Sequence, residues 1–450
     1  MKAQGDLFGD VFSEAKGPPA LVEALVDRGK GVDGGPSPAR ADGAVSEACA
    51  VIDPPRALMA TAFADHLRQF RYQGQSTIEL VESGIRYFVN EFWTSGQRRG
   101  HSLHEVSYRA CFKPQLPGFF IERLTQPGDR VYDPFSGRGT TAVEAALLGR
   151  APAANDVNPL SAMLTEPRLA PPSLLAIADR LASLDLSVGA PDPAEDDLIA
   201  FYHPGTLREL TALRAWLLGK PVLDPVEVWI RMVALNRLTG HSPGFFSVYT
   251  LPPNQAVSAV SQRKINEKRG QVPPLRDVRA IILKKSRQLL ADGPPPPHPT
   301  ALLMTGRSDT APALADASVD LVVTSPPFLD VVDYEGDNWL RCWFAGIEPA
   351  SVVIARHRDT AAWETFVRGT FESLARVVRP GGFVAFEVGE VRGGRILLER
   401  HVVAAIEGLP FDVLGVMVNT QEFTKTANCW GVGNNTRGTN TNRIVLAVRR

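Results

Sequence analysis

The sequence lacks several features that would assign the protein to a specialised class. Its four cysteines, Cys49, Cys111, Cys342 and Cys429, show no CxxC spacing, which argues against a zinc site and a disulfide framework and fits a reducing cytoplasm. No apolar run approaches the roughly 20 residues of a membrane-spanning helix, and the first residues carry no signal-peptide hydrophobic segment. The formal net charge is only −1, so a polyanionic partner would have to meet a local basic region. We expect a cytoplasmic protein without a metal or a membrane partner.

Composition divides the 450 residues into three kinds of segment. Residues 1–55 include a Gly-, Pro- and Ala-rich stretch without periodicity and are predicted to be a flexible tail. Residues 56–170 and 300–450 alternate strand and helix patterns, which predicts one α/β domain with a mostly parallel sheet. Residues 171–299 interrupt this pattern with helical, acidic and basic stretches and end in PPPPHP, typical of a stiff linker. We therefore predict an inserted region there.

Short apolar runs that end in turn residues predict the strands of the sheet. They lie at 130–134, up to about 155, and at 301–306, 320–327, 381–389, 411–419 and 442–448. Helices are predicted at 140–150 and 360–378. A further helix is predicted in 77–93, from apolar residues at Ile78, Val81, Ile85, Phe88, Val89 and Phe92.

The stretch DPFSGRGTT, residues 133–141, joins a predicted strand to a predicted helix. Gly137 and Gly139 allow a tight turn and close approach of a ligand to the backbone. The third glycine of G-x-G-x-x-G is missing, so the dinucleotide fingerprint is not met. Asp156, at the end of the next strand, is placed to accept both hydroxyls of a ribose. This pattern favours a nucleoside with a small anionic group, and the alternative is a Gly-rich turn without a ligand.

Residues 112–150, followed by NDVNP and later by TSPPF, resemble the S-adenosylmethionine-dependent DNA amino-methyltransferases. The resemblance covers 112–159 and 301 to about 389, and a Ser-Pro-Pro-aromatic signature is typical of the N4-cytosine type. It implies a Rossmann-like methyltransferase sheet, mostly parallel with an antiparallel C-terminal strand, interrupted by an inserted recognition region. It also implies S-adenosyl-L-methionine as cofactor.

The resemblance also implies roles for single residues around the cofactor. The segment 112–117, with Lys113 and Pro114, would close over the methionine end. The methionine part would be wrapped by Asp133, Phe135, Gly137, Gly139, Thr140 and Thr141. Asp156 and Asn158 would serve the ribose side, and Asp309 would accept from the adenine amino group. Two alternatives stay open, because Asn158 also suits a helix cap and Asp309 a turn.

The stretch TSPPF, residues 324–328, is the predicted reacting end. Transfer of a methyl group to an exocyclic amine needs no covalent intermediate, so positioning should dominate catalysis. The Ser325 hydroxyl and the Pro326 carbonyl are acceptors for the amine hydrogens, and the ring constraints of Pro326 and Pro327 aim them in advance. Phe328 offers a ring on which a flipped base can stack. The alternative is a rigid turn that only ends a strand.

The inserted region is the predicted reader of the target. Between 261 and 290 it holds nine Lys or Arg residues against two acidic ones. Phosphate contacts are predicted for Arg263, Lys264, Lys268, Arg269, Arg276, Arg279, Lys284 and Lys285, and base contacts for Asn254 and Gln255. The alternative is a solvated helix face. A polar loop at 428–443 suits either a tight hairpin or a position beside the substrate.

The N-terminal QGDLF resembles the short peptide with which bacterial repair proteins dock on the sliding clamp. Gln4, Asp6, Leu7 and Phe8 would make this contact, although a five-residue match also arises by chance.

Together these features favour a site-specific DNA methyltransferase that acts on the N4 amine of cytosine, with duplex DNA, and hence the nucleoid, as its partner. Ser before Pro-Pro carries the choice of cytosine, and no Pro-Cys dipeptide suggests a C5-cytosine nucleophile. The alternatives are adenine N6 in DNA, an amine in RNA, or a catalytically idle, clamp-tethered DNA-binding module.

Overall fold

The structure is a computed structural model that describes residues 54–93, 100–108, 111–189, 193–250, 256–329, 334–352, 354–355, 357–392, 395–420 and 442–450. Several predictions fall outside these residues. They concern the tail with its clamp motif (Gln4, Asp6, Leu7 and Phe8), Asn254, Gln255, and the polar loop up to 441. Among the described residues, no helix has the length and apolar character needed to cross a membrane.

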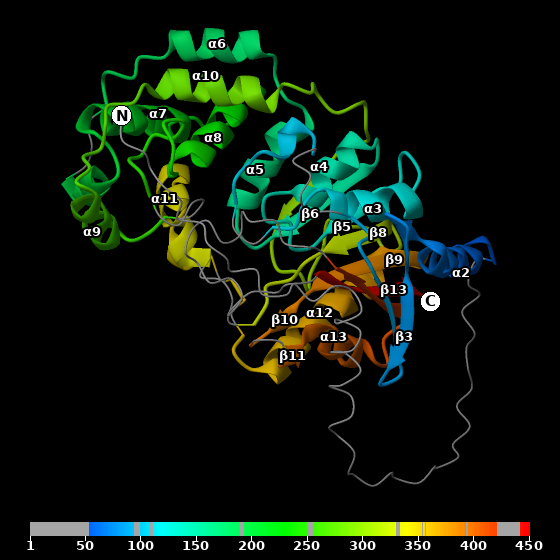
Figure 1. The fold of residues 1–450 in the computed structure, drawn as a ribbon. Coiled ribbons are helices and arrows are strands. Elements are labelled where there is room, and N and C mark those ends of the chain that lie inside the picture. The colour runs from blue at the N-terminus through cyan, green and yellow to red at the C-terminus, as the bar shows by residue number, and fades with distance from the viewer. Residues whose placement is uncertain are drawn as a thin grey trace, which may run out of the picture.

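A nine-stranded sheet forms the centre of the molecule (Figure 1). Its strand order is β3-β4-β12-β13-β9-β8-β5-β6-β7. The bounds are β3 Ile78–Glu82, β4 Ile85–Asn90, β5 Arg130–Asp133, β6 Ala151–Asp156, β7 Leu302–Thr305, β8 Val319–Thr324, β9 Val378–Val388, β12 Phe411–Asn419 and β13 Asn442–Arg449. Strands β7, β6, β5, β8 and β9 run parallel, whereas the C-terminal strand β13 is antiparallel to both neighbours. The predicted fold class, α/β and mostly parallel with an antiparallel C-terminal strand, is confirmed.

Helices cover both faces of the sheet because its central strands are apolar on both sides. In β8, Leu321 and Val323 pack on the face of α2 (Pro54–Gln69) and α3 (Gln115–Leu124). Val322, between them, packs on the face of α12 (Thr360–Val377) and α13 (Leu398–Ile406). This alternation is the two-residue period of a strand. Helix α4 (Thr140–Leu147) lies beside α3, and α5 (Leu160–Leu169) lies beside α4 (Figure 1).

The helix predicted in 77–93 is wrong, because this segment forms the hairpin of β3 and β4. The chain turns at Ser83 and Gly84, which both adopt positive φ angles of 50° and 76°. Two successive positive φ values are typical of the two-residue turns that join antiparallel strands. The apolar residues of 77–93 fit the two-residue period of a strand as well as the 3.6-residue period of a helix. Tyr87 packs on the α12 face, and Phe88 packs on the opposite face.

The inserted residues form a group of helices at one end of the sheet (upper left in Figure 1). They are α6 (Leu174–Ser183), α7 (Pro204–Leu218), α8 (Pro225–Arg237), α9 (Ala259–Arg269) and α10 (Val278–Leu289), together with α11 (Tyr334–Ala345), which follows TSPPF. One apolar cluster joins Val143 and Leu164 of α4 and α5 to Trp229, Ile282 and Phe344 of this group. The helical group therefore shares a core with the helices that cover the sheet, and the division into domains stays a prediction.

The remaining elements are short. They are the strand pairs β1 (Arg71–Tyr72) with β2 (Gln75–Ser76) and β10 (Glu390–Val391) with β11 (Ile396–Leu397), and the 3-10 helices Ser102–His104, Pro193–Ala200 and Pro349–Ser351.

Candidate active site

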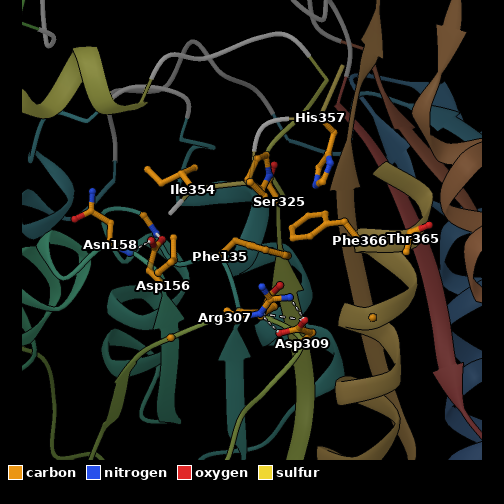
Figure 2. A pocket seen from close by; sticks show the side chains of 18 of the residues that line it. Phe135, Asp156, Asn158, Arg307, Asp309, Ser325, Ile354, His357, Thr365 and Phe366 are labelled. Atoms are coloured by element: carbon orange, nitrogen blue, oxygen red, sulfur yellow. Dashed lines mark hydrogen bonds and ion pairs between the residues drawn. The ribbon is translucent and has the colours of Figure 1, made fainter. Parts of the chain in front are cut away.

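A cavity of about 610 Å³ lies at the carboxyl ends of β5, β6, β7 and β8, against one side of α12. The order of these strands explains its place. From β5 the chain first builds outward through β6 and β7, and then returns to the other side of β5 with β8. Loops diverge at such a switch point, which opens a crevice for a ligand. Figure 2 shows Phe135 between Asp156 on one side and Phe366 on the other.

The Gly-rich loop after β5 is held in place by Asp156 from the end of β6. One carboxylate oxygen of Asp156 accepts a hydrogen bond from the Gly137 N–H at 2.8 Å, and the other accepts from the Asn158 N–H at 2.9 Å. Burial raises the pKa of Asp156. Gly139 adopts a φ of 77°, and a Cβ there would collide with Thr165 on α5. Asp156 lines the cavity while bracing the loop, so any ribose would use its remaining lone pairs.

Asn158 and Asp309 line the same cavity, and each has a second role. The Asn158 side-chain oxygen accepts at 3.0 Å from the N–H of Leu160, the first residue of α5. Arg307 forms an ion pair with Asp309, and this hydrogen-bonded contact lowers the pKa of the Asp309 carboxyl. Asp309 therefore faces the cavity with its charge already partly neutralised (Figure 2).

Other residues predicted around the cofactor do not line this cavity. Asp133 is buried and accepts from Thr324 Oγ1 at 2.6 Å and from the Phe135 N–H at 3.0 Å, so it ties β5 to β8. Burial raises the pKa of Asp133 to about 7. Thr140 and Thr141 are also buried, and Thr141 Oγ1 donates to the Val323 carbonyl at 3.0 Å. These residues shape the loop from behind, and their predicted contacts with a cofactor stay predictions.

Lys113 and Pro114 also lie away from the cavity. Lys113 lines a second cavity of about 640 Å³, and Pro114 a third of about 390 Å³. The structure therefore does not bring the segment 112–117 over the first cavity.

The TSPPF stretch reaches the cavity through Ser325 and Pro327 only. The Pro327 carbonyl accepts from Trp363 Nε1 at 2.9 Å, which ties the stretch to α12. Pro326 is buried, and Phe328 packs against the apolar cluster under α12. Phe328 therefore does not present its ring to the cavity as expected. The rings that do line it include Phe135 and Phe366, whose centroids are 5.5 Å apart.

Glu387, near the end of β9, is a functional candidate that sequence reasoning missed. Its side chain is 6% exposed and lies near the Ser325 hydroxyl, whose influence lowers the carboxyl pKa. Asn442 Nδ2, at the start of β13, donates to Glu387 Oε1 at 2.7 Å. Burial raises the pKa of Glu387 to about 7, although Ser325 and Asn442 oppose this rise. The available signal was a lone carboxylate in the otherwise apolar run FVAFEV.

The residues predicted to bind DNA occupy different environments on α9 and α10. Lys264, Lys268 and Lys284 are exposed. Arg263 pairs with Asp197 at 2.6 Å, and Arg269 lies over the Tyr249 ring, 3.9 Å from its centroid. Arg279 Nε donates to the Leu181 carbonyl at 3.0 Å, which joins α10 to α6, and Arg276 is half-buried. Lys285 differs from its neighbour Lys284 because it is buried and points to the second cavity.

Residues 56–163 match the model of the N6_N4_Mtase family, described as DNA methylase. This segment and the curated relatives make the chain similar to the DNA amino-methyltransferases. Its curated relatives include the Type II methyltransferase M.MvaI from Kocuria varians, 27% identical over 31% of this chain and 27% of the relative. Another is the Type II methyltransferase M.BsoBI from Geobacillus stearothermophilus, 21% identical over 64% of this chain and 61% of the relative.

These matches span less than two thirds of each relative's length. Among solved structures, a geranyl diphosphate methyltransferase in complex with SAM aligns with 75% of this chain and 85% of its own. The identity is 10% and the TM-score 0.31, which supports no functional conclusion.

Proposed function

We propose that the protein transfers a methyl group from S-adenosylmethionine to an exocyclic amine in DNA, with N4 of a flipped cytosine as the favoured target. The observation that carries this proposal is the meeting of the Gly-rich loop, Asp156 and Ser325 in one cavity, with the buried Glu387 carboxyl near Ser325. The matches to Type II methyltransferases support DNA as the substrate. The choice of cytosine rests on the resemblance of Ser-Pro-Pro to the N4-cytosine signature.

The residues around the cavity suit the proposed cofactor. Asp156 and Asp309 supply carboxylates, and Phe135 supplies an aromatic face, which together complement ribose hydroxyls, an adenine amine and a positively charged sulfonium. When bound, S-adenosylmethionine supplies a methyl group that an amine nitrogen can attack in line with the sulfur–carbon bond. Asp156, Asn158 and the loop with Gly137 would hold it.

Ser325 and Glu387 account for the proton that the amine must lose. When Glu387 is ionised, it would accept a hydrogen bond from the Ser325 hydroxyl, so that the lone pairs of Ser325 Oγ are left to accept from the amine. Positive charge grows on the amine nitrogen as it attacks the methyl group. The hydrogen bond to Ser325 strengthens with this charge, so it stabilises the transition state more than the bound substrate. As the new nitrogen–carbon bond forms, the amine proton passes to Ser325 and the Ser325 proton to Glu387. A carboxyl pKa near 7 suits this exchange.

The direct test is methylation of defined DNA duplexes by the full chain, followed by digestion to nucleosides and mass spectrometry. We expect N4-methyldeoxycytidine. N6-methyldeoxyadenosine would keep the reaction class and overturn the choice of cytosine, and activity confined to RNA would overturn DNA as the substrate. Calorimetry without any binding of S-adenosylmethionine would overturn the enzyme proposal itself.

A further inference from the structure

The second cavity, of about 640 Å³, lies between the helical group and the segment that precedes α3. Residues of α8, α10 and the Gly-rich loop line it together with that segment. Four of the lining residues are cations, Lys113, Arg138, Arg237 and Lys285, and one is a carboxylate, Glu105. Such an excess of one charge in a concave, partly buried site favours a ligand of the opposite charge.

Arg237 and Lys285 are buried cations of this cavity, and the one carboxylate that lines it with them, Glu105, pairs with Lys285 from an exposed position. Arg237 is 8% exposed. Its guanidinium donates hydrogen bonds to the backbone and side-chain oxygens of Asn236 and lies over the ring of Phe245. Lys285 is 6% exposed, and its Nζ lies 3.4 Å from the carboxylate of Glu105, which is largely exposed. Two buried like charges are costly unless an anion joins them.

The electrostatic effect of this burial appears in both side chains. Burial lowers the pKa of Lys285, and the charge of Arg237 lowers it further. Burial and the charge of Arg341 lower the pKa of Arg237 to about 10. An anion in the cavity would relieve this repulsion, since an opposite charge favours the charged form of each group.

Arg138, by contrast, stabilises the backbone that surrounds the cavity. Its Nη1 donates to the Val106 carbonyl at 2.8 Å, and its Nε donates to Thr140 Oγ1 at 3.1 Å. It therefore fixes the segment before α3 against the start of α4. Lys113 and His241 also line the cavity, and both are exposed, so its rim is open to a long ligand.

Tyr108 lines both the second cavity and the candidate active site. Its ring is in van der Waals range of a Cβ built on Gly137, and Arg341 lies over it, 5.4 Å from the centroid. If a nucleotide placed its base in the active site past Tyr108, its sugar–phosphate backbone would lie at the second, basic cavity. A chain of phosphates passing an open basic rim fits this geometry better than a free anion.

We propose that the second cavity binds a backbone phosphate of the DNA strand whose target base enters the active site, with Lys285 and Arg237 as the phosphate-binding side chains. This inference rests on the proposed function and adds the substrate contact that the active site alone does not supply.

The test compares two adjacent lysines of α10 in the full chain. Lys285→Met removes the buried cation, and Lys284→Met removes the same charge from the exposed face. The affinity for a substrate duplex is measured across a salt series. We expect Lys285→Met to weaken binding about tenfold, as for a hydrogen bond to a charged group. The slope of log K against log salt should become shallower by about 0.9, the value for one lost phosphate contact. Lys284→Met should change the affinity by less than about threefold, as is usual for an exposed charge.

Methylation kinetics and stability separate this role from a structural one. For Lys285→Met, the KM for the duplex should rise and kcat at saturating duplex should stay within about twofold. Its affinity for S-adenosylmethionine should be unchanged, and its Tm should not fall, because a buried charge has been removed. Lys285→Arg, which keeps the charge, should retain the wild-type salt slope.

Several outcomes would overturn the inference. If Lys284→Met and Lys285→Met weakened duplex binding equally, the overall positive charge of α10 would explain the effect without a phosphate contact in the cavity. An unchanged salt slope in Lys285→Met, while the wild type methylates DNA, would refute the phosphate contact and leave the proposed function standing. Free inorganic phosphate that competes with the duplex at micromolar levels would assign the cavity to a small anion, and an RNA duplex bound equally well would refute DNA as the ligand. A wild-type chain that binds no duplex would refute both proposals.

Discussion

Two cavities share Tyr108 as a wall and differ in the balance of their charges. The active-site cavity is lined by aromatic rings and by three carboxylates against two arginines, whereas the second cavity is lined by four cations against one carboxylate. The formal net charge of −1 conceals this separation, because the charges nearly cancel over the whole chain. The difference suits a ligand pair of opposite sign, a cationic methyl donor on one side and a polyanion on the other. Charge averaged over a chain is thus a poor guide to its sites.

The largest effect is expected at the reacting end of the first cavity. Ser325→Ala should lower the rate of methyl transfer about 10²- to 10³-fold, because it removes an acceptor that acts on the transition state. The affinity for S-adenosylmethionine, measured by calorimetry, should be unchanged. Ser318→Ala, at a serine whose hydroxyl donates to the Ala315 carbonyl, is the matched control. A parallel loss of cofactor affinity would show that Ser325 is structural.

The next effect separates the two carboxylates at the cofactor end. Asp156→Ala should weaken binding of S-adenosylmethionine about 10- to 100-fold, since it removes a charged acceptor and the brace of the Gly-rich loop. Asp309→Ala should reduce the affinity for S-adenosylmethionine by a smaller factor, because Arg307 already partly neutralises that carboxylate. Calorimetry on both variants measures the difference. An unchanged Kd in Asp156→Ala, or a larger effect at Asp309, would contradict the assignment.

A pH dependence of similar or smaller size is expected from Glu387. Methyl transfer should rise with pH up to about 7, by about tenfold per unit below the pKa, because the ionised carboxylate must accept from Ser325. Glu387→Gln keeps an acceptor oxygen for Ser325 and should flatten the rate profile in this range. A profile in the variant that matches the wild type would remove Glu387 from the mechanism.

The same group makes an opposite prediction for stability. Because its folded pKa lies above its unfolded one, its contribution to stability is complete below about pH 4.5 and is lost as pH rises to about 7. Glu387→Gln should therefore reduce the fall in Tm across this window. Thermal unfolding at several pH values measures it.

The smallest effect is expected far from both cavities. Arg263 is exposed on α9 and paired with Asp197. Arg263→Gln should change the affinity for duplex DNA by less than about threefold, since exposed ion pairs and charges contribute little individually. Binding titrations beside Lys285→Met would show whether DNA affinity concentrates in the second cavity. A loss at Arg263 as large as that at Lys285 would spread the DNA interface over α9.

Local patterns were sufficient to predict most strands and the two loops that meet in the active site. The strand–turn–helix at 133–141 and the strand that ends in TSPPF obey short-range rules of period and turn chemistry. Parallel strands then bring their carboxyl ends to one edge of the sheet, so the proximity of Asp156 and Ser325 followed from topology. The same local rules failed at β3 and β4, where one set of apolar residues fitted two periods and the Ser83–Gly84 turn decided between them.

The sequence alone thus specified the family resemblance, the sheet and the residues at its switch point, because these depend on neighbours along the chain. The environments of Glu387 and Lys285 depended on packing between distant segments. Strand β9 places Glu387 beside Ser325, and β13 adds Asn442. Lys284 and Lys285 are adjacent in sequence, but the packing of α10 against α6 and α8 leaves Lys284 exposed and buries Lys285, whose ammonium pairs with Glu105. Burial sets the charge properties of a side chain, and burial is a property of the folded whole.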